Sequence, residues 1–205
     1  MKATITSLIF LLLSLTVSSQ TYKYIGIEEG LSNQKIYKIQ KDARGYMWFL
    51  THVGIDQYNG KEIKHYKLRE GNRELDPLLN INWTFLDKTG TLLVTGKQGR
   101  IFRYDSGHDR FVQIYNMYNY WNKDYHAFVR YSYIDQEDNV WLCGKSAIHL
   151  FNIESGQKQR ISNRLGNITC IEQINSEHFF IGTDKRIYLV KLENGNLKEL
   201  SCGKL

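Results

Sequence analysis

The chain has 205 residues, of which 42% are hydrophobic and 13% aromatic, and a formal net charge of +6 at pH 7. This apolar content excludes an intrinsically disordered protein, because disordered chains lack the residues needed to bury a core. The basic residues are scattered, with no cluster denser than that between Lys61 and Lys67. The charge is therefore interpreted as a solvated surface, and no nucleic-acid partner is expected.

Residues 1–19 have the pattern of a signal peptide. Lys2 precedes an apolar stretch at Leu8–Leu15, and small residues at Val17-Ser18-Ser19 suit cleavage before Gln20. The apolar stretch is shorter than the roughly 20 residues that a membrane span needs. We therefore expect an exported protein, with a retained membrane anchor as the alternative.

Residues 20–33 form a lead-in, in which Tyr22–Ile27 is predicted to be a strand. Four short strands joined by turns follow. They are predicted at Lys35–Gln40, Tyr46–Leu50, Gly54–Tyr58 and Glu62–Tyr66. Asn59-Gly60 predicts a type I′ hairpin turn, because both central residues of that turn need positive φ. Such a four-stranded meander is typical of one propeller blade.

The same pattern of strands and turns recurs along residues 34–205. Trp48, Leu93, Trp141 and Phe180 occupy equivalent positions, spaced 45, 48 and 39 residues apart. The four predicted blades span approximately residues 34–68, 80–116, 127–162 and 167–201. A repeat of this length with four strands predicts an all-β fold, a β-propeller with about four blades that form an incomplete arc of a larger propeller. A generic all-β domain with chance hairpin similarity is the alternative.

The first blade carries a distinctive string. It contains Asp42, Gly45, Trp48, Thr51, Gly54 and Tyr58, and Trp141 repeats the tryptophan in blade three. This string resembles the repeat of two-component regulator propellers, and Glu29–Ser32 resembles the lead-in of such sensors. The resemblance implies the periplasmic sensor part of a hybrid two-component system from a glycan-degrading, Gram-negative bacterium. Later blades depart from the string, with Leu93 or Phe180 for the tryptophan and Arg186 for the second glycine.

The two ends of the chain suggest an N-terminal fragment. In closed propellers a terminal strand often completes the last blade, but blade four has its own outer strand at Leu197–Ser201. We expect the chain to be cut after its fourth blade, with the alternative of a closed four-bladed ring. The expected partners are further blades of the same protein or a second copy, with membrane contact only through the missing C-terminal part. The isolated fragment is expected to aggregate or to be degraded, because its end blades would expose apolar side chains.

The sequence contains no pattern typical of catalysis or of cofactor binding. His-Glu-x-x-His, Gly-x-Ser-x-Gly and Cys-x-x-Cys are absent, and Gly90…Gly96-Lys97 departs from a phosphate-binding loop in spacing. The three cysteines fit no metal-binding spacing. We expect no catalytic residues, no metal and no cofactor in a chain that is not an enzyme. The histidine kinase implied for the complete family member is absent from these residues.

The candidate ligand-binding residues lie in two sets of loops. In a blade with strands a to d, the b–c turns and the d–a connections share one face, and loops on a rigid scaffold often carry function. The b–c turns present His52, Lys97, Lys145 and Arg186, and the aromatic connection 116–126 presents Tyr118, Tyr120, Trp121, Tyr125 and His126. Aromatic rings suit stacking on sugars, so the predicted ligand is an oligosaccharide. In the alternative interpretation, these aromatic residues cover a blade edge or are buried in a contact between domains.

Three functions remain open. The preferred one is a non-catalytic periplasmic segment that senses an oligosaccharide. The first alternative is a structural or protein-binding propeller that docks a partner chain. An exported propeller enzyme is less favoured, because the carboxylates lie mostly in the turns of the face opposite to the b–c turns.

Overall fold

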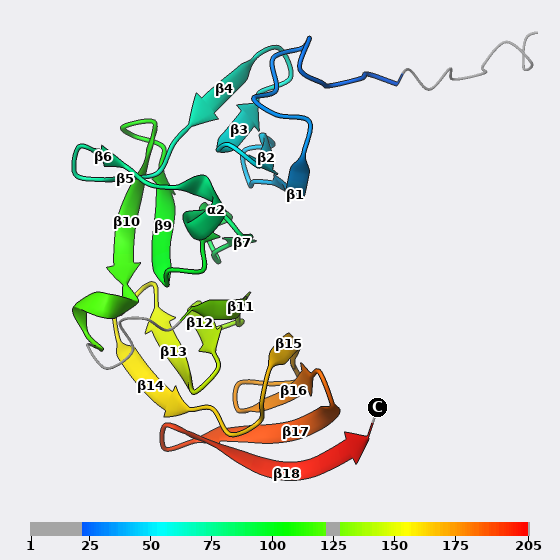
Figure 1. Cartoon of the computed structure of the whole chain (residues 1–205), viewed down its shortest axis with the longest axis vertical. Coiled ribbons are helices and arrows are strands. Elements are labelled where there is room, and N and C mark those ends of the chain that lie inside the picture. Colours follow the sequence, from blue (N-terminus) through cyan, green and yellow to red (C-terminus); the bar gives the residue numbers. More distant parts are fainter. Residues whose placement is uncertain (1–21, 122–127, 205) are drawn as a thin grey trace, which may run out of the picture.

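The computed structural model describes residues 22–121 and 128–204, and these residues form an arc of four antiparallel, four-stranded sheets (Figure 1). In each sheet the strands pair in the order in which they occur in the chain. The predicted all-β propeller fold is confirmed, and the described residues form no closed sheet. The predicted signal peptide lies outside the described residues.

The four sheets have the following bounds. Sheet one consists of β1 (Ile36–Lys41), β2 (Met47–Thr51), β3 (Ile55–Tyr58) and β4 (Ile63–Tyr66). Sheet two consists of β7 (Trp83–Leu86), β8 (Leu92–Thr95), β9 (Arg100–Asp105) and β10 (Arg110–Asn116). Sheet three consists of β11 (Val129–Ile134), β12 (Asn139–Gly144), β13 (Ala147–Asn152) and β14 (Lys158–Ser162). Sheet four consists of β15 (Ile168–Gln173), β16 (His178–Thr183), β17 (Arg186–Glu193) and β18 (Asn196–Lys204).

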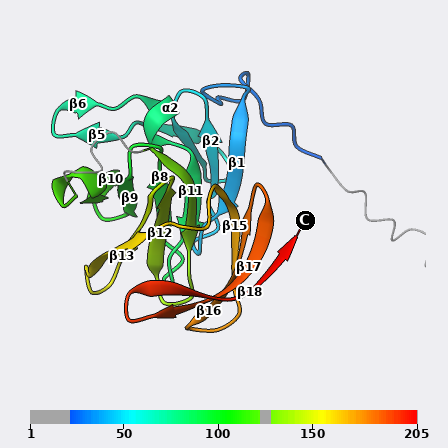
Figure 2. The ribbon, with the colours of Figure 1, turned by 60° about the horizontal axis from the view of Figure 1, so that its bottom comes forward.

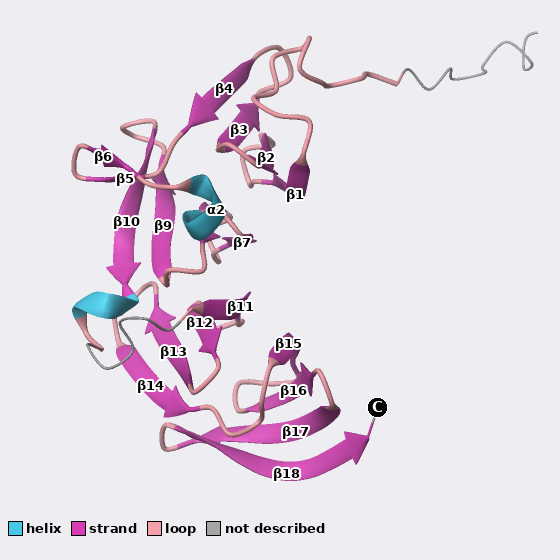
Figure 3. Cartoon of the chain, in the orientation of Figure 1, coloured by secondary structure: helices cyan, strands magenta, loops and turns pink. Residues whose placement is uncertain are grey.

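The first strand of each sheet lies on the inner side of the arc and the fourth strand on the outer side (Figure 1). Figure 2 shows the arc turned, with β16–β18 brought forward and the lead-in leaving beside β1. Three short elements lie outside the four sheets (Figure 3): the ribbon of β5 (Arg69–Glu70) and β6 (Arg73–Glu74), the helix α2 (Pro77–Asn80), and a 3-10 helix at Met117–Asn119.

Neighbouring sheets are held together by apolar clusters that alternate along the middle strands. On β8, Leu92 and Val94 belong to the cluster shared with sheet one, whereas Leu93 belongs to the cluster shared with sheet three. On β12, Trp141 belongs to the cluster shared with sheet four and Val140 to that shared with sheet two. Successive strand residues point to opposite faces. The middle strands therefore read as continuous apolar runs because both of their faces are buried.

A carboxylate organises the turn between the first two strands of each of the first three blades. In blade one, Asp42 Oδ1 accepts hydrogen bonds from the backbone N–H groups of Arg44 (2.9 Å) and Tyr46 (3.0 Å). Its Oδ2 accepts the indole N–H of the buried Trp48 at 2.9 Å. Gly45 in this turn has φ +88°, a conformation that favours glycine. The spacing from Asp42 to Trp48 is thus set by one hydrogen-bonded turn.

Blade three repeats this arrangement with different residues. Asp135 accepts the N–H groups of Glu137 (3.1 Å) and Asn139 (2.8 Å), and the indole N–H of Trp141 at 2.9 Å. Asp138 takes the position of the turn glycine, with φ +60°. The predicted motif residues Asp42, Trp48 and Trp141 therefore serve one structural purpose, a hydrogen bond between the turn carboxylate and the indole of the second strand.

Blade two keeps the carboxylate but changes its partner. Asp87 accepts the N–H groups of Thr89 and Thr91 at 2.9 Å. Leu93 stands in the place of the tryptophan, and its side chain has no N–H to donate. Arg103 fills this role, because its Nε donates to Asp87 Oδ2 at 2.9 Å.

Blade four has lost the carboxylate. Ile174 stands where the aspartate would be, and Asn175 Oδ1 instead accepts the N–H groups of Glu177 (3.1 Å) and His178 (3.0 Å). Phe180 occupies the tryptophan position and is 47% exposed, whereas its neighbour Phe179 is buried. The phenyl ring has no N–H to donate to this turn. The sequence motif is therefore least well kept in the blade that lacks the hydrogen bond between the ring and the turn carboxylate.

Thr51 and Gly54 shape the turn that follows β2. Thr51 Oγ1 accepts the Gly54 N–H at 3.2 Å and donates to the Gly54 carbonyl at 3.1 Å. A Cβ at Gly54 would lie 2.9 Å from the carbonyl oxygen of Tyr66, so this position has no room for a side chain. In blade four Thr183 makes the same pair of bonds with Arg186, at 3.1 Å each.

Two expectations of local structure were wrong. Residues 22–35 contain no strand, so the predicted strand Tyr22–Ile27 is corrected. A strand needs a ladder partner, and this segment instead ends in a polar contact: Asp56 Oδ2 accepts both the Ser32 N–H (2.8 Å) and the Ser32 hydroxyl (2.9 Å). The lead-in thereby docks on the buried Asp56 of blade one.

The turn at Asn59-Gly60 is the second correction. Gly60 has φ +98°, but Asn59 is not among the residues with positive φ, so the turn is not of type I′. The Asn59 side chain instead accepts the N–H groups of Lys61 (2.9 Å) and Glu62 (3.0 Å). Asn194 and Gly195, between β17 and β18, do have the two positive φ angles, +47° and +76°.

Replacing Asp135 tests the structural role of the turn carboxylate. Asp135→Ala leaves the indole N–H of Trp141 and two backbone donors without their acceptor. We expect it to lower the free energy of unfolding by about 1–3 kcal/mol, measured by urea denaturation of the full chain. The exposed Glu154→Ala serves as the control, with a change within about 0.5 kcal/mol. Equal effects of the two variants would contradict this role.

Candidate functional site

The structure places the four predicted b–c residues on four different blades. Lys97, Lys145 and Arg186 are exposed and His52 is half-buried. Two of them contact residues of their own blade: the Tyr37 hydroxyl lies 2.7 Å from His52 Nδ1, and Arg186 Nη1 lies 3.8 Å from Cys202 Sγ. Within residues 22–121 and 128–204, no hydrogen bond joins any two of the four. They occupy separate positions along the arc and do not form one cluster.

Residues 117–121, which follow β10, form a hydrogen-bonded turn. Trp121 N–H donates to the Met117 carbonyl at 3.2 Å, and its indole N–H donates to the Tyr115 hydroxyl at 3.2 Å. Its ring lies 5.7 Å from that of His149. Trp121 and Tyr118 pack against the cluster between sheets two and three. For these two residues the structure corresponds to the alternative interpretation, in which the aromatics cover a blade edge.

Among the described residues 117–121, Tyr120 is the aromatic residue that faces solvent. Its side chain is 51% exposed. Its ring is parallel to that of Tyr115, with centroids 5.7 Å apart, and Lys158 Nζ lies 4.6 Å from its centroid. Lys158 begins β14, at the strand end opposite to the b–c turns. Tyr120 therefore lies apart from the b–c residues, which sequence reasoning had placed on the same face. Tyr125 and His126 lie outside the described residues.

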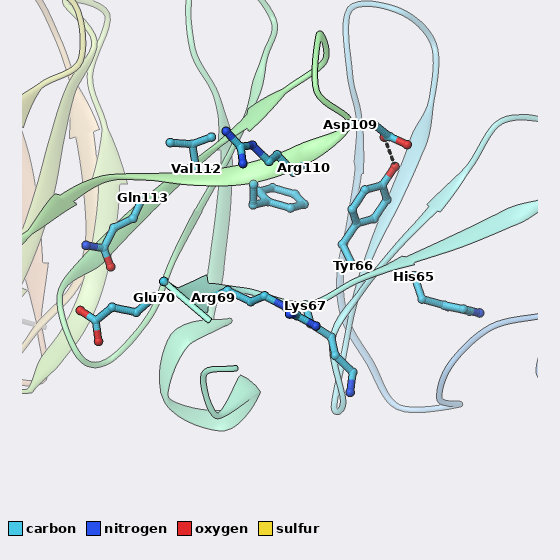
Figure 4. Close-up of a pocket in the computed structure, with 11 residues that line it drawn as sticks. His65, Tyr66, Lys67, Arg69, Glu70, Asp109, Arg110, Val112 and Gln113 are labelled. Carbon is cyan, nitrogen blue, oxygen red and sulfur yellow. Dashed lines mark hydrogen bonds between the residues drawn. The ribbon is translucent and has the colours of Figure 1, made fainter. Parts of the chain in front are cut away.

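A groove with a volume of about 600 Å³ lies between the outer edges of blades one and two (Figure 4). One wall is formed by the end of β4 and by β5, and the other by β10. Its lining residues are His65, Tyr66, Lys67, Arg69, Glu70, Gly71, Asp109, Arg110, Phe111, Val112 and Gln113. Sequence reasoning missed this groove, because the β5–β6 ribbon belongs to no blade repeat. The available signal was the charged Arg-Glu pairs on either side of Gly71-Asn72.

Asp109 is the most strongly bonded acid of the groove. It accepts hydrogen bonds from the hydroxyls of Tyr104 (2.6 Å) and Tyr66 (2.5 Å), and Lys64 Nζ lies 3.0 Å away. The hydrogen bond from Tyr104, followed by those from Tyr66 and Lys64, lowers the pKa of Asp109 to about 2. Burial, followed by the hydrogen bond to Asp109, raises the pKa of Tyr66. These interactions keep Asp109 ionised and its donors in place.

Two observations bear on metals and on the membrane. Within the part of the chain that the structure describes, no group of three His, Cys, Asp or Glu side chains is arranged to hold a metal ion. In the same residues, no helix has the length and apolar character required to cross a membrane.

Comparisons with known proteins agree with this architecture. The sequence model of the two component regulator propeller family matches residues 30–52, which contain the end of the lead-in together with β1 and β2. The predicted resemblance is confirmed: this segment is similar to a two component regulator propeller repeat. No curated protein sequence matches the chain at a significant level.

Solved structures show the same fold at low sequence identity. One is the extracellular domain of a protein described as a hybrid two component system, BT3049 from B. thetaiotaomicron, with a TM-score of 0.65 and 18% identity over 87% of this chain and 26% of that chain. The chain thus spans about a quarter of that relative.

Two further structures belong to proteins of other kinds. The dihydro-heme d1 dehydrogenase NirN has a TM-score of 0.61 at 11% identity, over 85% of this chain and 38% of that one. PorZ, a surface component of the type-IX secretion system of Porphyromonas gingivalis, has a TM-score of 0.54 at 8% identity, over 80% and 20% of the two chains. At such identities the likeness shows the propeller fold alone.

Removing the hydroxyl of Tyr104 tests the cause of the low pKa of Asp109. We expect Tyr104→Phe to raise this pKa from about 2 toward the ordinary value of about 3.9. Carboxyl ¹³C NMR during an acid titration measures the change. The lowered pKa stabilises the fold above pH ~3.9, and this contribution is lost as the pH falls toward 2. Because the Asp109 side chain is 48% exposed, solvent screening keeps the effect on stability small.

Tyr37→Phe is the matched control for this titration. Tyr37 is exposed whereas Tyr104 is buried, and the Tyr37 hydroxyl contacts His52 and not Asp109. An Asp109 titration that is the same in both variants would contradict the hydrogen-bond explanation.

Proposed function

We propose that the chain is the ligand-sensing propeller segment of an exported hybrid two-component sensor, that it recognises an oligosaccharide, and that it has no catalytic activity of its own. The observation that carries the proposal is the family repeat at residues 30–52, in which Ser32 docks on Asp56 and Trp48 on Asp42. The fold shared with an extracellular domain of a hybrid two component system supports it. The signal-peptide pattern of residues 1–19 supports export to the periplasm.

The use of the carboxylates supports a binding role over a catalytic one. Asp42, Asp87 and Asp135 accept hydrogen bonds from their own turns, and Asp109 is held by two tyrosines. The hydrogen bonds from Tyr104 and Tyr66 lower the pKa of Asp109, whereas a general acid needs a raised one. The propeller fold itself also occurs in the dehydrogenase NirN, so the argument rests on these residues and not on the fold.

The aromatic surface at Tyr120 is the candidate sugar contact. Its exposed ring is held by stacking on Tyr115 and by Lys158. An exposed aromatic ring stacks on the C–H face of a sugar, and the adjacent amine can donate hydrogen bonds to hydroxyl groups.

Calorimetric titration tests this proposal. The full chain is titrated with a panel of neutral and acidic oligosaccharides. We expect at least one member to bind, and Tyr120→Ala to weaken that binding about tenfold, which corresponds to one lost stacking contact. Tyr24→Ala, which removes a tyrosine that is 75% exposed on the lead-in, should leave the affinity unchanged. The proposal fails if no oligosaccharide binds, and the assignment to Tyr120 fails if both variants bind like the wild type.

Protein binding is the second candidate function. The face of blade four that points away from blade three exposes Phe180, Ile187 and Leu200, at 47%, 43% and 46%. An apolar sheet face of this kind suits a further blade or a second copy. Light scattering of the full chain at several concentrations tests it: concentration-dependent dimers that Phe180→Ser weakens support this function, and a monomer throughout argues against it.

A further inference from the structure

We propose that the groove between β4, β5 and β10 binds an acidic oligosaccharide, with the anionic group of one sugar held by Arg69 and a sugar ring resting on Phe111. The groove lies at the outer rim between blades one and two, apart from Tyr120 between blades two and three. The proposal rests on the proposed function in taking the ligand to be a sugar, and adds a separate site with a preference for negative charge.

The shape of the groove suits a ligand of this size. Its volume of about 600 Å³ lies within the range of roughly 300–1,000 Å³ typical of small-molecule sites. Leu68 and Leu75 anchor the β5–β6 ribbon in the cluster between sheets one and two. One wall therefore comes from an insertion that is fixed to the core, and the other from the outer strand of a blade.

The charges of the groove leave a positive excess. Both acids are neutralised by neighbours: Glu70 lies 2.6 Å from Arg73 and 3.4 Å from Arg100, and Asp109 is bonded to two tyrosines and a lysine. The side chains of Arg69 and Arg110, in contrast, make no hydrogen bond or ion pair within the described ranges. Arg69 extends from the β5 wall, and Arg110 projects from the far side of β10 (Figure 4). Arg69 is thus the free cation that faces the groove, and Arg110 adds positive potential at its rim.

The floor of the groove is aromatic and held in place. The ring of Phe111 packs against Trp48, Tyr66 and Tyr104, with centroid distances of 5.6, 5.7 and 5.4 Å. It is only partly buried, so part of the ring remains open to the groove. A fixed aromatic surface contacts a sugar without a large loss of side-chain entropy.

The polar groups around this floor suit hydroxyl groups. Gln113 follows Phe111 by two residues and therefore points to the same face of β10. Its Oε1 is buried and makes no hydrogen bond within the residues that the structure describes. A side-chain amide offers both a donor and an acceptor, as sugar hydroxyls require.

An anionic sugar fits this combination better than a neutral one. The planar guanidinium of Arg69 can bind a carboxylate or a sulfate through two parallel hydrogen bonds. A metal cation is disfavoured, because the groove has a positive excess and its two acids already have partners.

Calorimetric titration of the full chain with three probes tests the proposal. The probes are trigalacturonic acid, a sulfated heparin tetrasaccharide and neutral maltotriose. We expect at least one acidic probe to bind, and Arg69→Gln to weaken it about tenfold to a hundredfold, as expected for a lost charge-assisted contact. A smaller loss of affinity is expected for Arg110→Gln, because Arg110 projects from the far side of β10 (Figure 4). Arg164→Gln, at an exposed arginine of the loop between blades three and four, is the matched control and should bind like the wild type.

Salt provides a second readout that needs no variant. Raising the salt concentration should weaken the acidic probe and leave any maltotriose binding unchanged, because salt screens exposed charges. The proposal is overturned if neither acidic probe binds, or if Arg69→Gln binds like Arg164→Gln. Maltotriose binding that depends on Tyr120, together with no binding of either acidic probe, would overturn this inference and leave the proposed function standing.

Discussion

The well-formed blades depend on the hydrogen bonds that one carboxylate accepts at the first turn of the blade. In blades one and three, Asp42 and Asp135 each accept two backbone N–H groups and one indole N–H. A buried carboxylate is unfavourable unless it is fully hydrogen-bonded, and the turn supplies the required donors. The same bonds fix the tryptophan that fills the space before the next blade. One side chain thus couples the local turn to the packing between sheets.

This coupling explains where the molecule can vary. The middle strands β8 and β12 of blades two and three have both faces buried between sheets, so their sequence is constrained to apolar residues. The outer edges carry no such constraint, and here the chain inserts the β5–β6 ribbon and the 3-10 helix at Met117–Asn119. The groove beside Arg69 and the exposed ring of Tyr120 both lie next to these insertions. Recognition is therefore best supported on the outer rim, where a rigid scaffold carries variable segments.

The fold could be predicted from the sequence because its signals are local. Turn residues and apolar runs recur at a fixed spacing, and Trp48 and Trp141 mark equivalent positions that the structure shows to be bonded alike. The prediction of a strand at Tyr22–Ile27 was wrong because a strand needs a partner strand, and the local sequence does not reveal whether one is available. Asn59-Gly60 has the composition of a type I′ turn, but the Asn59 side chain caps a longer turn.

The candidate site was less predictable, because it depends on contacts between blades. Trp121 looks like a displayed aromatic in the sequence, but its indole bonds to Tyr115 and its ring packs beside His149. Arg69 and Phe111 are 42 positions apart in the sequence and line one groove only because blades one and two pack side by side. No spacing rule within a single repeat connects them.

The most direct test of the central role of the turn carboxylate is the hydrogen exchange of the indole N–H groups, followed by ¹⁵N NMR. The chain has four tryptophans. The indoles of Trp48 and Trp141 donate to buried carboxylates, whereas that of Trp83 has no hydrogen bond among the described residues. We predict strong protection of Trp48 and Trp141 and rapid exchange of Trp83. Equal and rapid exchange of all three would contradict the account.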